Sequence, residues 1–199
     1  MPNIKTCHYV IYFPVLPNPP EPLVVSVKLL TILNSIDDVS FVNKLKDKFK
    51  FITVARFEEK KGIEYAIKAF SLASRFNRNA EFDILGSGKL ESKYRKLVKN
   101  LGIVEKVNFI NNLRTSDPRG TIIQHLNSSD VFVLPSITSI NGDKEGTPIV
   151  LMEAQSCGLP CISTYHAGIP EVVIDDKTGW LVNEKDYKSL AKVMLTSMN

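Results

Sequence analysis

A chain of 199 residues, with 44% hydrophobic and 23% charged residues, has the composition of a globular protein and is too short for two domains of about 150 residues or more each. No apolar run approaches the roughly 18 residues that cross a bilayer, so a membrane-spanning protein is not expected. The net charge of +4 is mild and dispersed, which argues against nucleic acid as a partner but allows anionic ligands or peripheral contact with a membrane.

The chain begins with a proline-rich stretch, residues 1–24, which we interpret as an irregular extension because proline removes backbone hydrogen bonds. One domain is then expected over residues 25–199. The three cysteines form an odd set without metal-type spacing. We therefore expect no metal site and reduced thiols, which are typical of a cytoplasmic protein.

From residue 51 onward, short apolar runs alternate with amphipathic patterns. The runs are rich in β-branched and aromatic residues, as buried strands are, and they cover 51–56, 81–86, 106–110, 130–136 and 160–165. A less regular run at 24–33 fits either a strand or a short helix. Helical patterns cover 62–77, 90–102, 121–126, 148–157 and 186–195. The alternation predicts an α/β fold with a doubly wound parallel sheet, that is, a Rossmann-like domain.

Ligands of a doubly wound sheet bind at the carboxyl ends of its strands. The polar residues that follow the predicted strands are therefore site candidates: Arg56, Gly86 to Gly88, Asn111, Asn112, Ser136 and Thr164 to His166. Arg56 and Lys61 lie just before a predicted helix, and two cations at a helix N-terminus favour an anion. An alternative stays open, in which Lys60 and Lys61 belong to a solvated loop and Arg56 pairs with a neighbouring acid.

The turn Gly86-Ser87-Gly88 resembles the start of a dinucleotide fingerprint, but the third glycine of G-x-G-x-x-G is missing. The two glycines still allow the backbone to approach a ligand closely. The turn therefore indicates the wall of a cleft and argues against an NAD-dependent oxidoreductase.

The stretch EGTPIVLMEAQSCGLP, residues 145–160, predicts a helix over 148–157 with Thr147 as its cap and Pro148 at its first position. Because most side chains in it are apolar, we expect a buried helix with Glu153 inside it. A buried carboxylate needs a partner. The vicinal hydroxyls of a ribose would be one, while a buried ion pair or a capped backbone amide is the alternative.

Together these residues resemble the donor-binding half of a retaining glycosyltransferase of the GT-B fold, in the large group 1 family (family 4 type). The resemblance rests on FITVARFEEKKGIEYAIKAF, FDILGSGKLESKYRKLVKNLGIVEKVNFI and the segment from DVFVLPS to KTGWLV, and it covers residues 30–185. The part with NGDKEGTPIVLMEA and HAGIPE is most similar to transferases of colanic-acid and exopolysaccharide biosynthesis.

The resemblance implies roles for individual residues. The two-glutamate motif of the family, E-x(7)-E, falls on Glu145 and Glu153, with Glu145 expected on the donor sugar and Glu153 on the ribose. Arg56 and Lys61 are expected on the diphosphate. The remaining donor contacts implied are the glycine turn and the helix start: Gly86, Gly88, Gly146, Thr147, Pro148 and Ile149. Ser35 departs from the family, which usually has glycine there.

The implied reaction moves a hexose from a UDP-sugar or GDP-sugar to a saccharide or lipid-linked acceptor, with retention of anomeric configuration. Arg56, Lys61 and the helix start would stabilise the negative charge that grows on the leaving diphosphate. The scheme needs no cofactor and no metal, and the sequence contains no D-x-D carboxylate cluster. The expected location is the cytoplasm, with at most peripheral contact with the inner face of the membrane.

The family also implies a separate N-terminal half that carries the acceptor site and a catalytic histidine, for which this sequence has no room. His166 lies near the expected cleft but does not match that histidine, and His8 and His125 are interpreted as incidental. Three functions therefore compete: a donor-binding half that needs a partner subunit, a binding module without catalysis, and a truncated remnant.

Overall fold

The computed structural model describes residues 48–198, which belong to one compact unit. The predicted extension at 1–24, the strand or helix at 24–33 and the turn at Ser35 lie outside the described residues. None of the helices between residues 48 and 198 combines the length with the hydropathy that a bilayer crossing needs.

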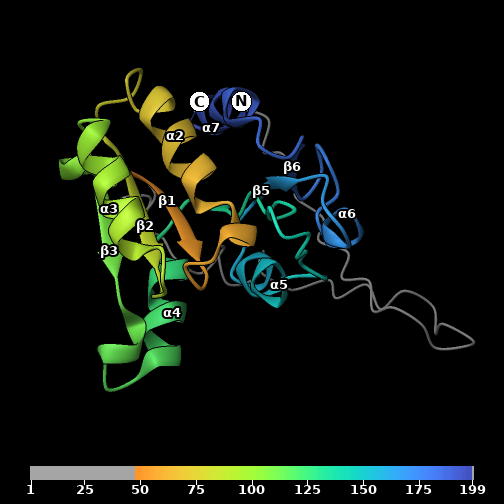
Figure 1. Cartoon of the computed structure of the whole chain (residues 1–199), viewed down its shortest axis with the longest axis horizontal. Coiled ribbons are helices and arrows are strands. Elements are labelled where there is room, and N and C mark those ends of the chain that lie inside the picture. The colour runs from red at the N-terminus through yellow and green to blue at the C-terminus, as the bar shows by residue number, and fades with distance from the viewer. Residues whose placement is uncertain (1–47, 199) are drawn as a thin grey trace, which may run out of the picture. The chain divides into compact units, whose positions relative to one another are not determined.

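The centre of the fold is one sheet of six parallel strands in the order β3-β2-β1-β4-β5-β6 (Figure 1). The strands are β1 (Phe49–Val54), β2 (Ala80–Leu85), β3 (Val107–Ile110), β4 (Val131–Val133), β5 (Cys161–Thr164) and β6 (Gly179–Val182). The chain winds outward from β1 to β3 and then returns to build β4 to β6 on the other side of β1. This confirms the predicted doubly wound parallel sheet and puts its topological switch point between β1 and β4.

Helices cover both faces of the sheet (Figure 1). The first face carries α2 (Ile63–Ala73), α3 (Glu91–Asn100) and α7 (Tyr187–Ser197), and the second carries α4 (Pro118–Asn127), α5 (Ile149–Ser156) and α6 (Ile169–Val172). Three short 3-10 turns complete the elements: η2 (Glu59–Lys61), η3 (Val104–Lys106) and η4 (Asn112–Arg114).

Alternation along the strands divides the core into two layers. Phe51 packs with α2, α3 and α7, while its neighbour Ile52 packs with α4, α5 and α6, and both are fully buried. Burying one such side chain contributes about 1.5–3 kcal/mol. On the first face the amphipathic pattern predicted over 62–77 is confirmed, since α2 buries one apolar stripe whose members are all 0–2% exposed: Ile63, Ala66, Ile67, Phe70 and Ala73.

Two elements were not predicted, and a third begins earlier than predicted. Strand β6 begins with a glycine, and helix α6 is only four residues long, so neither shows a clear pattern of its type. Helix α4 begins three residues before the predicted 121–126, at Pro118, because the Asp117 carboxylate caps it by accepting the Gly120 N–H at 2.9 Å.

Gly62 lies where the loop after β1 packs against the loop after β4. Its φ is +64°, and a Cβ built there would lie 1.8 Å from the carbonyl oxygen of Pro135, which follows β4. Any larger residue must therefore adopt a left-handed backbone and also push the loop after β4 away.

We expect Gly62→Ala to destabilise the domain more than Gly102→Ala. Gly102 has a similar φ of +68° but open space around a built Cβ, so its substitution isolates the backbone cost of about 1–2 kcal/mol. Chemical denaturation of both variants measures the difference. Equal losses of stability would contradict the proposed contact with Pro135.

The Asp175 carboxylate holds β6 beside the end of β5. It accepts hydrogen bonds from the Tyr165 hydroxyl at 2.6 Å and from the Leu181 N–H at 2.8 Å. These two hydrogen bonds lower the pKa of Asp175 below its ordinary value, and the one from Tyr165 has the larger effect.

Because its pKa is lowered in the folded state, ionised Asp175 stabilises the fold above the unfolded pKa of about 3.9, and this contribution is lost as the pH falls through the folded pKa. We expect Asp175→Asn to be less stable than the unmodified chain at neutral pH, with a difference that shrinks below about pH 4. Denaturant titrations across this range measure it. Asp176→Asn is the control, since the Asp176 side chain accepts neither hydrogen bond, and a constant difference for Asp175→Asn would contradict the linkage.

Candidate functional site

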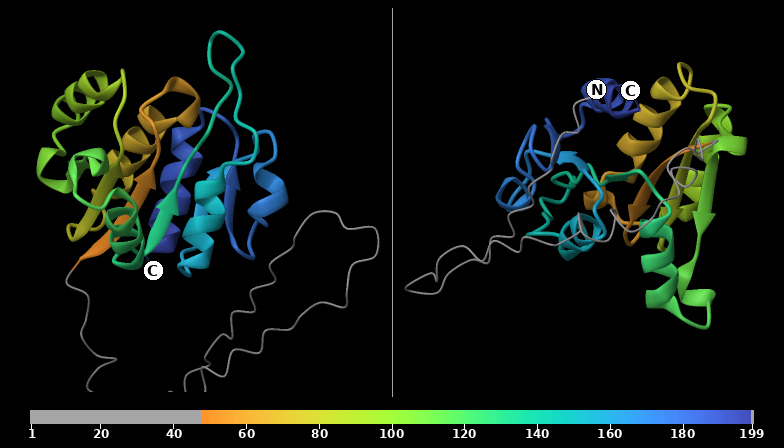
Figure 2. Two further views of the ribbon diagram at one scale, coloured as in Figure 1. Left: turned by 90° about the horizontal axis from the view of Figure 1, so that it is seen from below. Right: turned by 180° about the vertical axis from the view of Figure 1, so that it is seen from behind.

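Two loops meet at the carboxyl edge of the sheet, at the switch point. They are residues 55–62, between β1 and α2, and residues 134–148, between β4 and α5, the long loop that rises above the sheet in Figure 2. The Ile137 N–H donates to the Lys60 carbonyl at 2.9 Å, and the Ile140 N–H donates to the Glu59 carboxylate at 3.3 Å. The loops are therefore fixed to each other through one backbone hydrogen bond and one hydrogen bond from backbone to side chain.

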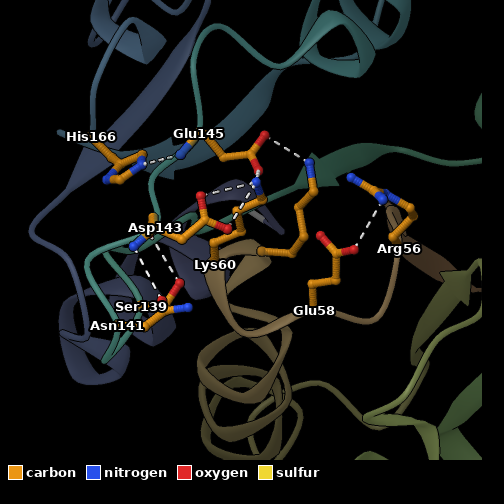
Figure 3. Close-up of polar contacts among 9 residues, drawn as sticks. Arg56, Glu58, Lys60, Ser139, Asn141, Asp143, Glu145 and His166 are labelled. Atoms are coloured by element: carbon orange, nitrogen blue, oxygen red, sulfur yellow. Dashed lines mark hydrogen bonds and ion pairs between the residues drawn. The ribbon is translucent and has the colours of Figure 1, made fainter.

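The centre of the site is an ion pair between Lys61 and Glu145. Figure 3 shows Glu145 with its neighbours Lys60, Asp143 and His166. Lys61 Nζ lies 2.7 Å from Glu145 Oε2, and the two side chains are only 13% and 9% exposed. Lys60 Nζ lies 3.7 Å from the other oxygen of Glu145 and 3.2 Å from the Asp143 carboxylate. The hydrogen bond to Asp143 raises the pKa of Lys60 above its ordinary value. Both lysines are thus directed into the site, and the alternative of a solvated lysine loop is wrong.

Arg56 lies at the rim of the same site. Its side chain is 73% exposed and pairs with Glu58 at 3.0 Å, as the alternative with a neighbouring acid predicted. Arg56 borders two hollows of about 360 and 220 Å³. The larger also borders Lys60 and Asp143, whereas the smaller reaches the glycine turn and the turn after β3. Because it is exposed and borders both hollows, the Arg56 guanidinium could exchange Glu58 for an anion that enters either one.

The glycine turn after β2 packs directly on the loop after β1. A Cβ on Gly86 would lie 2.0 Å from the Ala55 carbonyl oxygen, and a Cβ on Gly88 would lie 2.8 Å from Phe57 backbone atoms. The Phe57 N–H donates to the Ser87 carbonyl at 2.8 Å. The glycines therefore permit contact between two backbone segments of the protein, and their contact with a ligand stays a prediction.

Helix α5 begins one residue later than predicted. Pro148 is its N-cap residue and Ile149 its first residue, and Thr147 makes no capping hydrogen bond. Thr147 instead packs beside Gly168, where a built Cβ would lie 2.3 Å from its hydroxyl oxygen. The predicted helix start at Pro148 with a Thr147 cap is therefore wrong by one residue, because the Thr147 side chain is engaged by the turn after β5.

The prediction that α5 is buried and encloses Glu153 is wrong. Leu151 and Ala154 face the core, but Ile149 is 68% exposed, and Glu153 is exposed as well. With 3.6 residues per turn, Glu153 lies about 100° around the helix from Ala154 and about 200° from Leu151. Within residues 48–198 its carboxylate forms no hydrogen bond or ion pair. Of the two carboxylates in the E-x(7)-E motif, the one shielded from solvent is that of Glu145.

His166 belongs to the site although sequence reasoning gave it no role. Its side chain is buried, with Nε2 accepting the Glu145 N–H at 3.1 Å and Nδ1 lying 2.6 Å from Glu184 Oε1. Burial alone raises the pKa of Glu184, but hydrogen bonds from His166 and Thr138 outweigh it, so the pKa lies below its ordinary value. In the sequence, the position of His166 directly after a predicted strand indicated that it could lie in the site. Glu184 follows β6, which was not predicted, so no sequence pattern pointed to it.

Residues 48–198 contain no group of three or more His, Cys, Asp or Glu side chains placed to hold a metal ion. The charged groups gathered by the two loops are instead paired lysines and carboxylates beside an exposed arginine. Such a set can bind an anionic group through its cations and hydroxyl groups through its carboxylates.

Comparison with known proteins identifies the family of the chain. The family described as glycosyl transferases group 1 matches residues 35–199. Two curated relatives are the amylovoran biosynthesis glycosyltransferase AmsK of Erwinia amylovora, 35% identical over 164 residues, and WcaL of Escherichia coli strain K12, named for colanic acid biosynthesis and 40% identical over 143 residues. These matches cover 80% and 72% of this chain but only 39% and 34% of the relatives.

Among solved structures, Anabaena HepE in complex with UDP-glucose matches with a TM-score of 0.64 and 20% identity, over 77% of this chain and 40% of HepE. At this identity the match bears on the fold alone, and it agrees with the predicted sheet. The chain therefore spans between one third and two fifths of these proteins, and it belongs to the group 1 glycosyltransferase family.

Proposed function

We propose that residues 48–198 bind the diphosphate and the sugar of a nucleotide-sugar donor at the switch point. The observation that carries the proposal is the pair Lys61–Glu145, a shielded cation and a shielded carboxylate that face each other between the two loops. The HepE structure, of the same fold, contains UDP-glucose. The ammonium group of Lys61 suits phosphate, and the carboxylate of Glu145 suits sugar hydroxyls.

The charges explain how a diphosphate would be held. Lys60, Lys61 and Arg56 come from one loop, and without ligand their partners are Asp143, Glu145 and Glu58. A diphosphate is a stronger acceptor than a single carboxylate because it brings several charged oxygens. It would therefore take up hydrogen bonds from the lysines while the exposed Arg56 turns from Glu58 towards it. The N–H groups at the start of α5, near Gly146 and Ile149, would add to these contacts.

The two glutamates would hold the hydroxyl groups on either side of the diphosphate. Once the lysines bind phosphate, Glu145 is free to accept hydrogen bonds from the donor sugar. Glu153, exposed on α5 without a partner within residues 48–198, is available for the ribose. The glycine turn with Gly86 and Gly88 would bring backbone close to the nucleotide.

We infer that the protein transfers a hexose, with retention, to a saccharide or lipid-linked acceptor in polysaccharide assembly. The bond between C1 and the diphosphate oxygen breaks with its electron pair going to that oxygen, while the acceptor hydroxyl oxygen bonds to C1 and passes its proton to the departing diphosphate. The cations of Arg56, Lys60 and Lys61 stabilise the developing charge, so catalysis is mainly electrostatic and needs no metal. The acceptor would bind to residues outside 48–198, in a second domain of the same or another chain.

The first test is thermal stability with nucleotides. Ligand at 100 times its Kd stabilises a protein by about 2.7 kcal/mol, and each kcal/mol raises the Tm of a chain of this size by about 2–4 °C. We expect UDP or GDP at millimolar concentration to raise the Tm, and Lys61→Ala to abolish the rise. Lys68→Ala is the control, since Lys68 pairs with Glu64 on α2, away from the site. Absence of a rise with every nucleotide would exclude donor binding.

The second test separates the sugar from the diphosphate. Glu145→Ala removes the proposed sugar contact and leaves both lysines available, so we expect UDP to bind at least as tightly but UDP-glucose to lose about 10- to 100-fold relative to UDP. Asp143→Ala is the matched control, because Asp143 also pairs with Lys60 but is 52% exposed and has no proposed sugar contact. Calorimetric titration measures the affinities of both variants for UDP and UDP-glucose, and for GDP and GDP-mannose as the guanosine counterparts. An unchanged ratio in Glu145→Ala would contradict the assignment.

A further inference from the structure

His166 connects three loops at the carboxyl edge of the sheet. It follows β5, it accepts a hydrogen bond from the N–H of Glu145 in the loop after β4, and it contacts Glu184 in the turn after β6. Glu184 in turn accepts the Thr138 N–H at 2.8 Å, which returns to the loop after β4. Both ends of the loop that carries Glu145 are thus attached to one histidine–carboxylate pair.

The hydrogen bonds assign the tautomer of His166. Because Nε2 accepts an N–H, it carries no hydrogen, and Nδ1 must carry the hydrogen that Glu184 accepts. Glu184 is therefore the group that turns the imidazole so that its lone pair points at the backbone of Glu145. A histidine that only filled space would leave its nitrogens unpaired or bound to water, whereas here both are used.

The backbone of Glu145 has little other support on this side. Its neighbour Gly146 has open space around a built Cβ, and beyond it Thr147 rests on Gly168, in the same turn as His166. On the opposite side the Glu145 carboxylate is held by Lys60 and Lys61. Those lysines are the groups expected to bind the diphosphate, so their hold on Glu145 weakens when donor enters. The hydrogen bond that the Glu145 N–H donates to His166 Nε2 does not involve phosphate and would persist.

We propose that His166, oriented by Glu184, is a positioning residue that fixes Glu145 for contact with the sugar of the donor. The inference rests on the proposed sugar-binding role of Glu145. It assigns no chemistry to the imidazole itself, because its two nitrogens are occupied by Glu145 and Glu184.

The test compares His166→Leu with His166→Gln in the full chain. Leucine removes both hydrogen bonds, whereas glutamine can place Oε1 near the position of Nε2 and accept the Glu145 N–H. The readout is the ratio of the Kd for UDP to that for UDP-glucose, and for GDP to GDP-mannose. His125→Leu is the matched control, since His125 also contacts a carboxylate, Asp83 at 3.3 Å, but lies on α4.

We expect His166→Leu to lower the ratio about tenfold while the Kd for the nucleoside diphosphate stays the same, and His166→Gln to restore most of it. In the double variant His166→Leu, Glu145→Ala the ratio should equal that of Glu145→Ala alone. Circular dichroism and melting confirm that the variants are folded.

Retention of the sugar preference in His166→Leu, equal weakening of both ligands, or failure of a folded His166→Gln to restore the ratio would each overturn the positioning role while leaving the proposed function intact. Absence of nucleotide binding by the unmodified chain would instead overturn the proposed function, and the inference with it.

Discussion

The arrangement of the site depends on one interaction, the ion pair between Lys61 and Glu145. Its members come from loops 84 positions apart in the sequence, and both are shielded from water. A shielded charge without a partner costs several kcal/mol, so each loop supplies the opposite charge that stabilises the charge of the other. Gly62, beside Lys61, lets the loops approach closely enough for the pair to form.

Much of the fold follows from sequence patterns because burial on both faces gives each central strand a continuous apolar run. The runs that form β1, β2, β4 and β5 are of this kind, and the α2 helix shows a regular apolar stripe. Strand β6 escaped prediction for a physical reason. Unlike β3, the other edge strand of four residues, it begins with a glycine, Gly179, whose missing Cβ allows close approach to the Cys161 carbonyl.

Sequence patterns could identify only those site residues that lie in the turns after predicted strands. Arg56 and Lys61 follow β1 directly, and topology alone brings that turn to the switch point. The burial of Glu153 was misjudged because composition shows how apolar a helix is but not which side faces the core. The role of His166 depends on hydrogen bonds to a backbone N–H and to Glu184, and such contacts between distant segments have no signature in local sequence.

The division of opposite charges between two loops also constrains how such proteins can be recombined. A chimaera that takes residues 134–148 from a relative, in order to change sugar preference, would exchange Glu145 and Asp143 while keeping the lysines that neutralise them. Where the relative carries a different charge at either position, the electrostatic balance of the crevice would then change together with the selectivity. Grafting residues 55–62 and 134–148 as one unit would preserve that balance, so the two segments are best regarded as a single exchangeable module.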